Sequence, residues 1–140
     1  MEAAVIAGLI RQASDAMQYS YAPYSRFRVG AALLAEDGSI FTGVNVENAA
    51  YPAGICAERT AFSKAVSQGL RQFRAIAIVG AGISGSPADF CYPCGFCRQV
   101  MAEFCGGDFV VIAALSPTEY RVMTLGELLP CSFGKNQLES

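Results

Sequence analysis

The segment CAERTAFSKAVSQGLRQFRAIAIVG, residues 56–80, decides the fold. Its first half, residues 56–68, has no glycine or proline and repeats small apolar residues at helical spacing, which predicts a helix that stops at Gly69. The run over residues 73–80 is short and apolar, as expected of a strand that is covered on both faces. A helix that leads into such a strand indicates an α/β sheet.

The chain before this segment predicts one helix and a hairpin. Apolar residues at helical spacing predict a helix over residues 3–17. Residues 27–35 and 40–47 are rich in β-forming side chains, and the turn residues 36–39 lie between them, so these two runs predict an antiparallel hairpin.

The chain after the segment continues the alternation of helix and strand. We expect a helix over residues 95–104, a strand over 109–115 and a short final helix near 124–129, followed by a tail. The order αββαβαβ, with strands too apolar for one solvated face, predicts a three-layer α/β/α fold with a mixed central sheet. The length, without a visible linker or repeat, predicts a single domain over residues 1–140.

Composition favours a small substrate. Hydrophobic residues make up 53% of the chain and charged residues 16%, which is more apolar than an ordinary domain, so we expect apolar surface between subunits. The net charge of -2 lacks the basic excess that usually accompanies binding to a phosphate backbone. A small-molecule substrate, and no nucleic acid, is the expectation.

The cysteines and the N-terminal residues together predict a cytoplasmic protein. Residues 1–17 lack the basic start and the longer apolar core of a signal peptide, and no later segment is long enough to span a membrane. Six cysteines in a short chain can form a disulfide framework, but that framework requires an exported protein. We therefore expect free thiols, no membrane contact and a reducing compartment.

Three of these thiols form a candidate metal site. Cys56 and the segment PCGFC at 93–97, which contains Cys94 and Cys97, can supply three of the four ligands of a tetrahedral zinc ion, in a chain without histidine. The fourth position then stays open for water, which makes catalysis possible. Two other interpretations remain: Cys91 can close the site as a fourth ligand, or the thiols can simply be buried.

The residues around the thiols fit a catalytic site. Glu58 is too close in sequence to Cys56 to be a comfortable fourth ligand, but it is well placed to move the protons of a metal-bound water. Helix N-termini at the thiols stabilise the thiolate form. Arg59 and Arg98 each follow a metal-site residue and can offset the negative charge of three thiolates by donating to the sulfurs, Arg59 being the stronger candidate.

Five segments of the chain carry a resemblance to a known family: YAPYSRFRVGAALL at 21–34, NVENAAY at 45–51, CAERTA at 56–61, PCGFCRQV at 93–100 and LLPCSF at 128–133. The three thiols with a non-ligating glutamate also match the ligand pattern of zinc deaminases. On these segments the chain resembles, almost from end to end, the small homotetrameric cytidine deaminases of pyrimidine salvage. This resemblance implies one Zn²⁺ per chain, a homotetramer with shared active sites, and hydrolytic deamination of free cytidine and deoxycytidine to uridine and deoxyuridine.

The same resemblance implies substrate contacts. Asn45 and Glu47 would bind the ribose 3′-hydroxyl, Phe27 would pack against the pyrimidine, and the backbone N–H of Ala57 would bind its 2-oxo group. Asn45 and Glu47 are two residues apart on the expected strand and therefore share one face, where an amide and a carboxylate can hold sugar hydroxyls. For either residue taken alone, a position at a solvated strand end is the simpler interpretation. Without the resemblance, Phe27 is more simply a core residue.

Aromatic residues are implied at the subunit boundaries, some of them from a neighbouring chain: Tyr24, Tyr51 and Phe133. The chain departs from the family pattern where bulk is added: Tyr92 replaces serine, and both Phe96 and Cys131 replace small residues. Tyr92 and Phe96 can narrow the pocket near the metal loop, and Cys131 can alter the geometry around Phe133.

The implied mechanism is attack of hydroxide on C4 of the cytosine, with Glu58 passing protons to N3 and to the departing amine. Three other hypotheses stay open. The enzyme can act on another cytosine-bearing small molecule such as blasticidin S, it can edit a polynucleotide, or the zinc site can stabilise an interaction module. The low charge of the chain argues against a polynucleotide substrate, which would need a basic groove. A zinc site that only stabilises an interaction module would not need Glu58 beside an open metal position.

Overall fold

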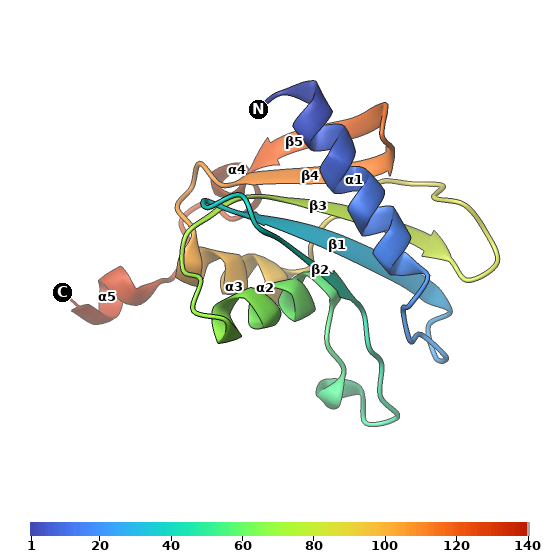
Figure 1. Cartoon of the computed structure of the whole chain (residues 1–140). Helices are drawn as coiled ribbons and strands as arrows, with labels where there is room; N and C mark the ends of the chain where they lie inside the picture. The colour runs from blue at the N-terminus through green and yellow to red at the C-terminus, as the bar shows by residue number, and fades with distance from the viewer. Residues whose placement is uncertain (140) are drawn as a thin grey trace.

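A five-stranded mixed sheet organises residues 1–139, which the computed structural model describes (Figure 1). The strands are β1 (Phe27–Ala35), β2 (Ile40–Val44), β3 (Phe73–Gly82), β4 (Val110–Ser116) and β5 (Glu119–Thr124), in the spatial order β2-β1-β3-β4-β5. Only β3 and β4 pair in parallel, while the other neighbours are antiparallel. The predicted mixed sheet is confirmed.

Helices cover both faces of this sheet, as the three-layer prediction requires (Figure 1). The helices are α1 (Ala3–Met17), α2 (Ala57–Ser67), α3 (Gly95–Phe104), α4 (Leu125–Leu128) and α5 (Lys135–Glu139), with a short 3-10 turn, η1 (Tyr51–Ala53). One apolar cluster lies between α1 and the sheet, and a second lies between the sheet and the pair α2 and α3. None of the helices in the described chain is long and apolar enough to cross a membrane.

Two glycines set how closely the helices approach the sheet. A Cβ on Gly30 would lie 2.0 Å from the backbone oxygen of Ala13 in α1, and a Cβ on Gly43 would lie 2.3 Å from the backbone oxygen of Ala57 in α2. Neither helix could pack at its present distance if these strand positions carried a side chain. Gly43 thus helps to place the start of α2, where the first thiol lies.

An aromatic cluster joins the two helices that carry the thiols. The Phe62 ring of α2 packs edge-on against Phe73, with ring centroids 5.1 Å apart, and stacks on Phe104 at the end of α3 at 6.1 Å. Phe62 is almost fully buried. These contacts hold α2 and α3 in one position relative to the sheet.

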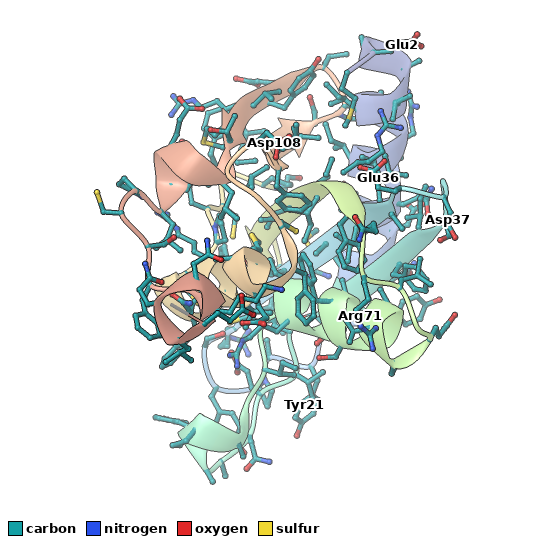
Figure 2. All side chains as sticks on the ribbon, turned by 90° about the vertical axis from the view of Figure 1, so that its left-hand side faces the viewer. Glu2, Tyr21, Glu36, Asp37, Arg71 and Asp108 are labelled. Carbon is teal, nitrogen blue, oxygen red and sulfur yellow. The ribbon has the colours of Figure 1, made fainter. Side chains whose placement is uncertain are left out.

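The structure corrects some boundaries. The second strand was predicted over 40–47 but ends at Val44, because Val46 forms isolated bridges with Tyr21 and Ile55 instead of continuing the ladder with β1. Figure 2 labels Tyr21 beside this segment. β5 was not predicted, since its short sequence EYRVMT mixes charged and apolar residues at the sheet edge. The predicted tail contains α5.

The hairpin turn lies at the end of the sheet that faces the viewer in Figure 2, where Glu36, Asp37 and Arg71 are labelled. The backbone N–H of Glu36 donates to the carbonyl of Gln72, so the hairpin turn contacts the link between α2 and β3. Gly38 has φ of +91°, which the predicted turn requires.

Candidate active site

Three thiols meet where α2 and α3 begin. Cys56 is the N-cap of α2, Cys94 is the N-cap of α3, and Cys97 lies in the first turn of α3. The Sγ atoms of Cys56 and Cys94 are 3.8 Å apart, and those of Cys94 and Cys97 are 3.5 Å apart. Tetrahedral zinc with ligands at about 2.3 Å separates two sulfurs by about 3.8 Å. The cluster fits one zinc ion per chain.

The pKa values of two thiols in the cluster are shifted in opposite directions. The Cys97 thiol, hydrogen-bonded to the sulfur of Cys56, is the largest cause that lowers the pKa of Cys56, to about 5, and Arg59 and Cys94 act in the same direction. The same hydrogen bond, together with burial, raises the pKa of Cys97. A divalent cation bound at these sulfurs would release the thiol protons that remain, because cysteine binds metal ions as thiolate.

Arg59 lies beside this cluster. Its Nη2 lies 3.7 Å from Cys56 Sγ, and its guanidinium carbon lies 5.8 Å from the centre of the exposed Phe96 ring. Arg98, the other candidate, instead donates from Nε to the Pro93 carbonyl and from Nη1 to the Leu128 carbonyl. Arg98 therefore braces the loop before α3.

Glu58 lies next to the sulfurs and out of solvent. It is the second residue of α2, and only 5% of its surface is exposed. Burial is the main cause that raises the pKa of Glu58 to about 7, and the charge on Cys56 adds to this rise. A carboxyl group with a pKa near neutrality can both accept and donate a proton, which is the property that a general acid/base needs.

A cavity of about 540 Å³ opens in front of Glu58. Cys56, Cys94 and Arg59 contribute to its wall. The wall also includes most of the predicted substrate-contacting residues: Tyr24, Asn45, Glu47, Tyr51 and Ala57. The structure thus brings the sulfur cluster, the carboxyl group and these side chains to one cavity of a size typical of small-molecule sites.

Two predicted contacts lie outside this wall. Phe27 is 41% exposed, and its ring sits against Gly80, where a Cβ would lie 2.8 Å from its Cζ. Phe133 is 60% exposed and lines a separate cleft beside the end of α3, where Gln99 donates to its carbonyl. Within one chain, Phe133 therefore does not contribute to the cavity.

Asn45 and Glu47 also form hydrogen bonds with residues 24–29 of the same chain. Glu47 Oε1 accepts hydrogen bonds from the backbone N–H groups of Tyr24 and Ser25, and the Ser25 hydroxyl also donates to the Glu47 carboxylate. The hydroxyl is the largest cause that lowers the pKa of Glu47, and the backbone N–H groups act in the same direction. Asn45 Oδ1 accepts from the Val29 N–H at 2.9 Å, while its Nδ2 donates to the Phe27 carbonyl. Both residues hold the segment 24–29 beside the cavity.

Sequence reasoning missed part of the wall. Ser25 lines the cavity and contacts Glu47, but a lone serine in a turn gives no signal. Cys91 and Tyr92 also line it, and they had drawn attention only as a possible fourth ligand and as added bulk. Cys91 lies outside the sulfur cluster of the described residues, and burial raises its pKa to about 12. All six cysteines are free thiols.

Comparison with known proteins identifies the family. Residues 5–113 match the model of the cytidine and deoxycytidylate deaminase zinc-binding region. A cytidine deaminase of Sporosarcina psychrophila is 49% identical over 130 residues, which cover 93% of this chain and 92% of that protein. One of Halalkalibacterium halodurans is 48% identical over 125 residues, covering 89% and 91%.

Solved structures agree with the sequence relatives. The crystal structure of cytidine deaminase from Burkholderia pseudomallei has a TM-score of 0.82 and 44% identity, covering 90% of this chain and 97% of that chain. Together with the match over residues 5–113, which includes all three thiols and Glu58, these likenesses show that the chain belongs to the cytidine deaminase family.

Proposed function

We propose that this protein is a zinc-dependent hydrolase that converts free cytidine to uridine and ammonia, and deoxycytidine to deoxyuridine. The observation that carries the proposal is the buried carboxyl group of Glu58 beside three converging sulfurs, at the wall of a cavity of about 540 Å³. Relatives that are 49% and 48% identical are named cytidine deaminase, which supports this substrate.

Cys56, Cys94 and Cys97 would hold the zinc ion, which would act as a Lewis acid and lower the pKa of a water molecule. Glu58 accepts a proton from the attacking water and passes it to N3 of the cytosine, while the water oxygen forms a bond to C4. Glu58 then moves the remaining hydroxyl proton to the exocyclic amine. The bond from C4 to that nitrogen breaks, ammonia leaves, and the C4 carbonyl of uridine remains.

The charge around Glu58 suits both proton transfers. In the metal-free chain, burial raises the pKa of Glu58 to about 7, so this carboxyl group can both take up and release a proton near neutral pH. Arg59 offsets part of the thiolate charge through its contact with Cys56, which keeps the attacking water acidic enough to react.

The substrate contacts follow the family resemblance. Asn45 and Glu47 bind the ribose, the Ala57 N–H binds the 2-oxo group of the pyrimidine, and Phe27 packs against the ring. Asn45 and Ala57 lie at the cavity, which supports their part. The ring of Phe27 lies near the same wall, because a Cβ on Gly80 would lie 2.8 Å from Cζ of Phe27 and 3.0 Å from Cβ of Cys91, which lines the cavity.

We propose further that four copies of this single-domain chain, residues 1–140, assemble and share their active sites. Tyr51 and Phe96 are each 77% exposed, and Phe133 is 60% exposed, so large aromatic surface is left uncovered in one chain. Phe133 then completes the cavity of a neighbour, with Tyr24 and Tyr51 at the boundary. Covering such surface is a usual reason for assembly.

The remaining biological context is also proposed. Three reduced ligand thiols require a reducing compartment, which supports a cytoplasmic protein that acts in pyrimidine salvage. The net charge of -2 supports free nucleosides, and not a polynucleotide, as the substrate.

The test is the loss of cytidine absorbance when purified protein is added, with uridine and ammonia measured as products. Turnover that disappears with a zinc chelator and returns with added zinc is expected. A zinc-loaded protein that leaves cytidine and deoxycytidine unchanged would refute the proposal. Single-stranded oligonucleotides and blasticidin S are tested as alternative substrates. A higher kcat/KM for either one than for cytidine would identify that compound, and not cytidine, as the preferred substrate.

A further inference from the structure

Arg121 of the edge strand β5 holds two aromatic side chains of the loop that leads to the thiols. Its Nη1 donates to the Tyr92 hydroxyl at 2.7 Å, and its guanidinium carbon lies 4.3 Å from the centre of the Phe90 ring. One planar cation therefore contacts two residues of the same loop, through a charge-assisted hydrogen bond and a cation–π contact.

This loop has no regular structure of its own to fix it. It joins β3 to α3 at one end of the sheet, and no helix or strand occurs between Gly82 and Gly95 (Figure 1). Arg98 braces its far end through the Pro93 carbonyl. Arg121 contacts Phe90 and Tyr92, which precede Pro93. The loop is therefore held by arginines from two different elements, α3 and β5.

Tyr92 connects this brace to the cavity. Tyr92 is one of the residues that line the cavity, together with Cys91 and Cys94, and it is 38% exposed. A tyrosine in an irregular loop can turn about two side-chain bonds. The hydrogen bond from Arg121 at the far end of the ring removes that freedom.

We propose that Arg121 is a positioning residue that fixes the Tyr92 ring as a wall of the cavity and thereby limits the size of the cytosine nucleoside that fits. The proposal rests on the deamination proposed above and concerns its substrate range. Both Arg121 and Tyr92 are exposed, so their contact contributes little to folding. Its effect is on the shape of the cavity.

The experiment compares discrimination between substrates. The zinc-loaded enzyme is given cytidine and three methylated analogues: 5-methylcytidine, N4-methylcytidine and 2′-O-methylcytidine. The variants are Arg121→Met, Tyr92→Phe, Tyr92→Ser and the double variant Arg121→Met with Tyr92→Phe. Arg74→Met is the matched control, since Arg74 is an exposed arginine at the opposite end of β3 from Gly80.

We expect Tyr92→Ser and Arg121→Met to relax discrimination against at least one analogue by roughly 3- to 10-fold in the ratio of kcat/KM values, because one methyl group in a pocket is resolved on this scale. The analogue that responds identifies the part of the substrate that faces the ring. Thermal unfolding should stay near that of the wild type, and Arg74→Met should leave every ratio unchanged.

The double variant tests whether Arg121 acts through the hydroxyl. Tyr92→Phe keeps the ring and removes the acceptor, so Arg121→Met should change discrimination less in the Tyr92→Phe background than in the wild type. Arg121→Lys, which can still donate to the hydroxyl, should recover part of the discrimination.

Unchanged ratios in Arg121→Met and Tyr92→Ser, in an enzyme that deaminates cytidine, would overturn the positioning role and leave the proposed function intact. Equal changes from Arg121→Met in both backgrounds would also overturn it. A wild-type enzyme that does not deaminate cytidine would overturn the proposed function and this inference with it.

Discussion

Arg59 and Cys56 are joined directly at the edge of the sulfur cluster, with Nη2 of the arginine 3.7 Å from Sγ of the cysteine. The two residues lie three positions apart at the start of α2, so the helix itself sets this contact. Both residues line the cavity. It partly balances a site that would otherwise carry the charge of three thiolates.

Arg59→Gln should therefore lower kcat by about 10- to 100-fold, since ligand partners tune metal sites on this scale. The lost positive charge makes the attacking water less acidic, so the pH at which activity reaches half its maximum should rise. Measuring kcat against pH checks this. Arg71→Gln is the control, because Arg71 is exposed and follows the C-terminal end of α2, away from the sulfur cluster. An Arg59→Gln enzyme with a wild-type pH profile would contradict the proposed effect of Arg59 on the attacking water.

Glu58→Gln should keep the metal and lose nearly all turnover, because the amide preserves the shape of the side chain but cannot accept a proton. The expected decrease in kcat is at least about 100-fold. Zinc content by elemental analysis and the rate of cytidine loss are measured on the same sample. A zinc-loaded variant with a near-normal rate would remove Glu58 from the mechanism.

Glu58 should also make the chelator-treated protein less stable as pH rises. Its pKa is raised by burial from 4.5 to about 7, so the folded state binds the proton more tightly than the unfolded state between these values. Stability from this group is present at pH 4.5 and is lost on passing pH 7.

Urea unfolding of the metal-free wild type and of metal-free Glu58→Gln, at pH 5 and pH 7.5, measures this loss. Relative to the variant, the wild type should lose on the order of 2 kcal/mol of unfolding free energy over this range. Parallel pH dependences in the two proteins would contradict the raised pKa.

Alanine at Cys56, Cys94 or Cys97 should abolish both zinc binding and activity, because two remaining sulfurs cannot hold the ion in the same way. Cys91→Ala is the matched control, since Cys91 lines the cavity but lies outside the sulfur cluster. The Cys91 variant should retain one zinc per chain. Loss of zinc from Cys91→Ala would instead support a closed site with four thiols.

Phe133→Ala should raise KM by about 10-fold or weaken assembly, although Phe133 is outside the cavity of its own chain. The side chain is 60% exposed, so the folded monomer should keep its thermal stability. Light scattering and kinetics over a range of protein concentrations measure both effects. A fully active wild-type monomer across working concentrations would refute the shared active site, and the roles of Tyr51 and Phe133 with it.

The sequence by itself determined the parts of this protein that depend on local rules. The helix over residues 56–68 was predicted from spacing and a terminal glycine, and α2 occupies Ala57–Ser67 with Cys56 as its cap. The predicted helix over 95–104 coincides with α3, and the short helix near Leu128 is present with a capping box at Thr124. Such features extend over one or two helical turns, and their signals lie in the same few residues.

Only the tertiary structure decided which distant groups share the cavity. Cys56 and Cys94 are 38 residues apart, and they meet because α2 and α3 pack on the same face of the sheet. The rise in the pKa of Glu58 comes from burial, which depends on the whole packed layer. Phe27 and Phe133 were assigned by resemblance to the site, yet one chain leaves both outside the cavity wall.

The edge strand β5 shows most directly what could not be predicted from the sequence. Only its first four residues, 119–122, alternate charged and apolar side chains, which is too short a pattern to predict a strand, and the strand is held by backbone pairing with β4. Without β5, nothing in the sequence connects Arg121 to Tyr92, 29 residues earlier. Residue types and spacing thus determined the chemistry of this site, whereas long-range packing decided its shape, since contacts between distant segments exist only after the sheet has formed.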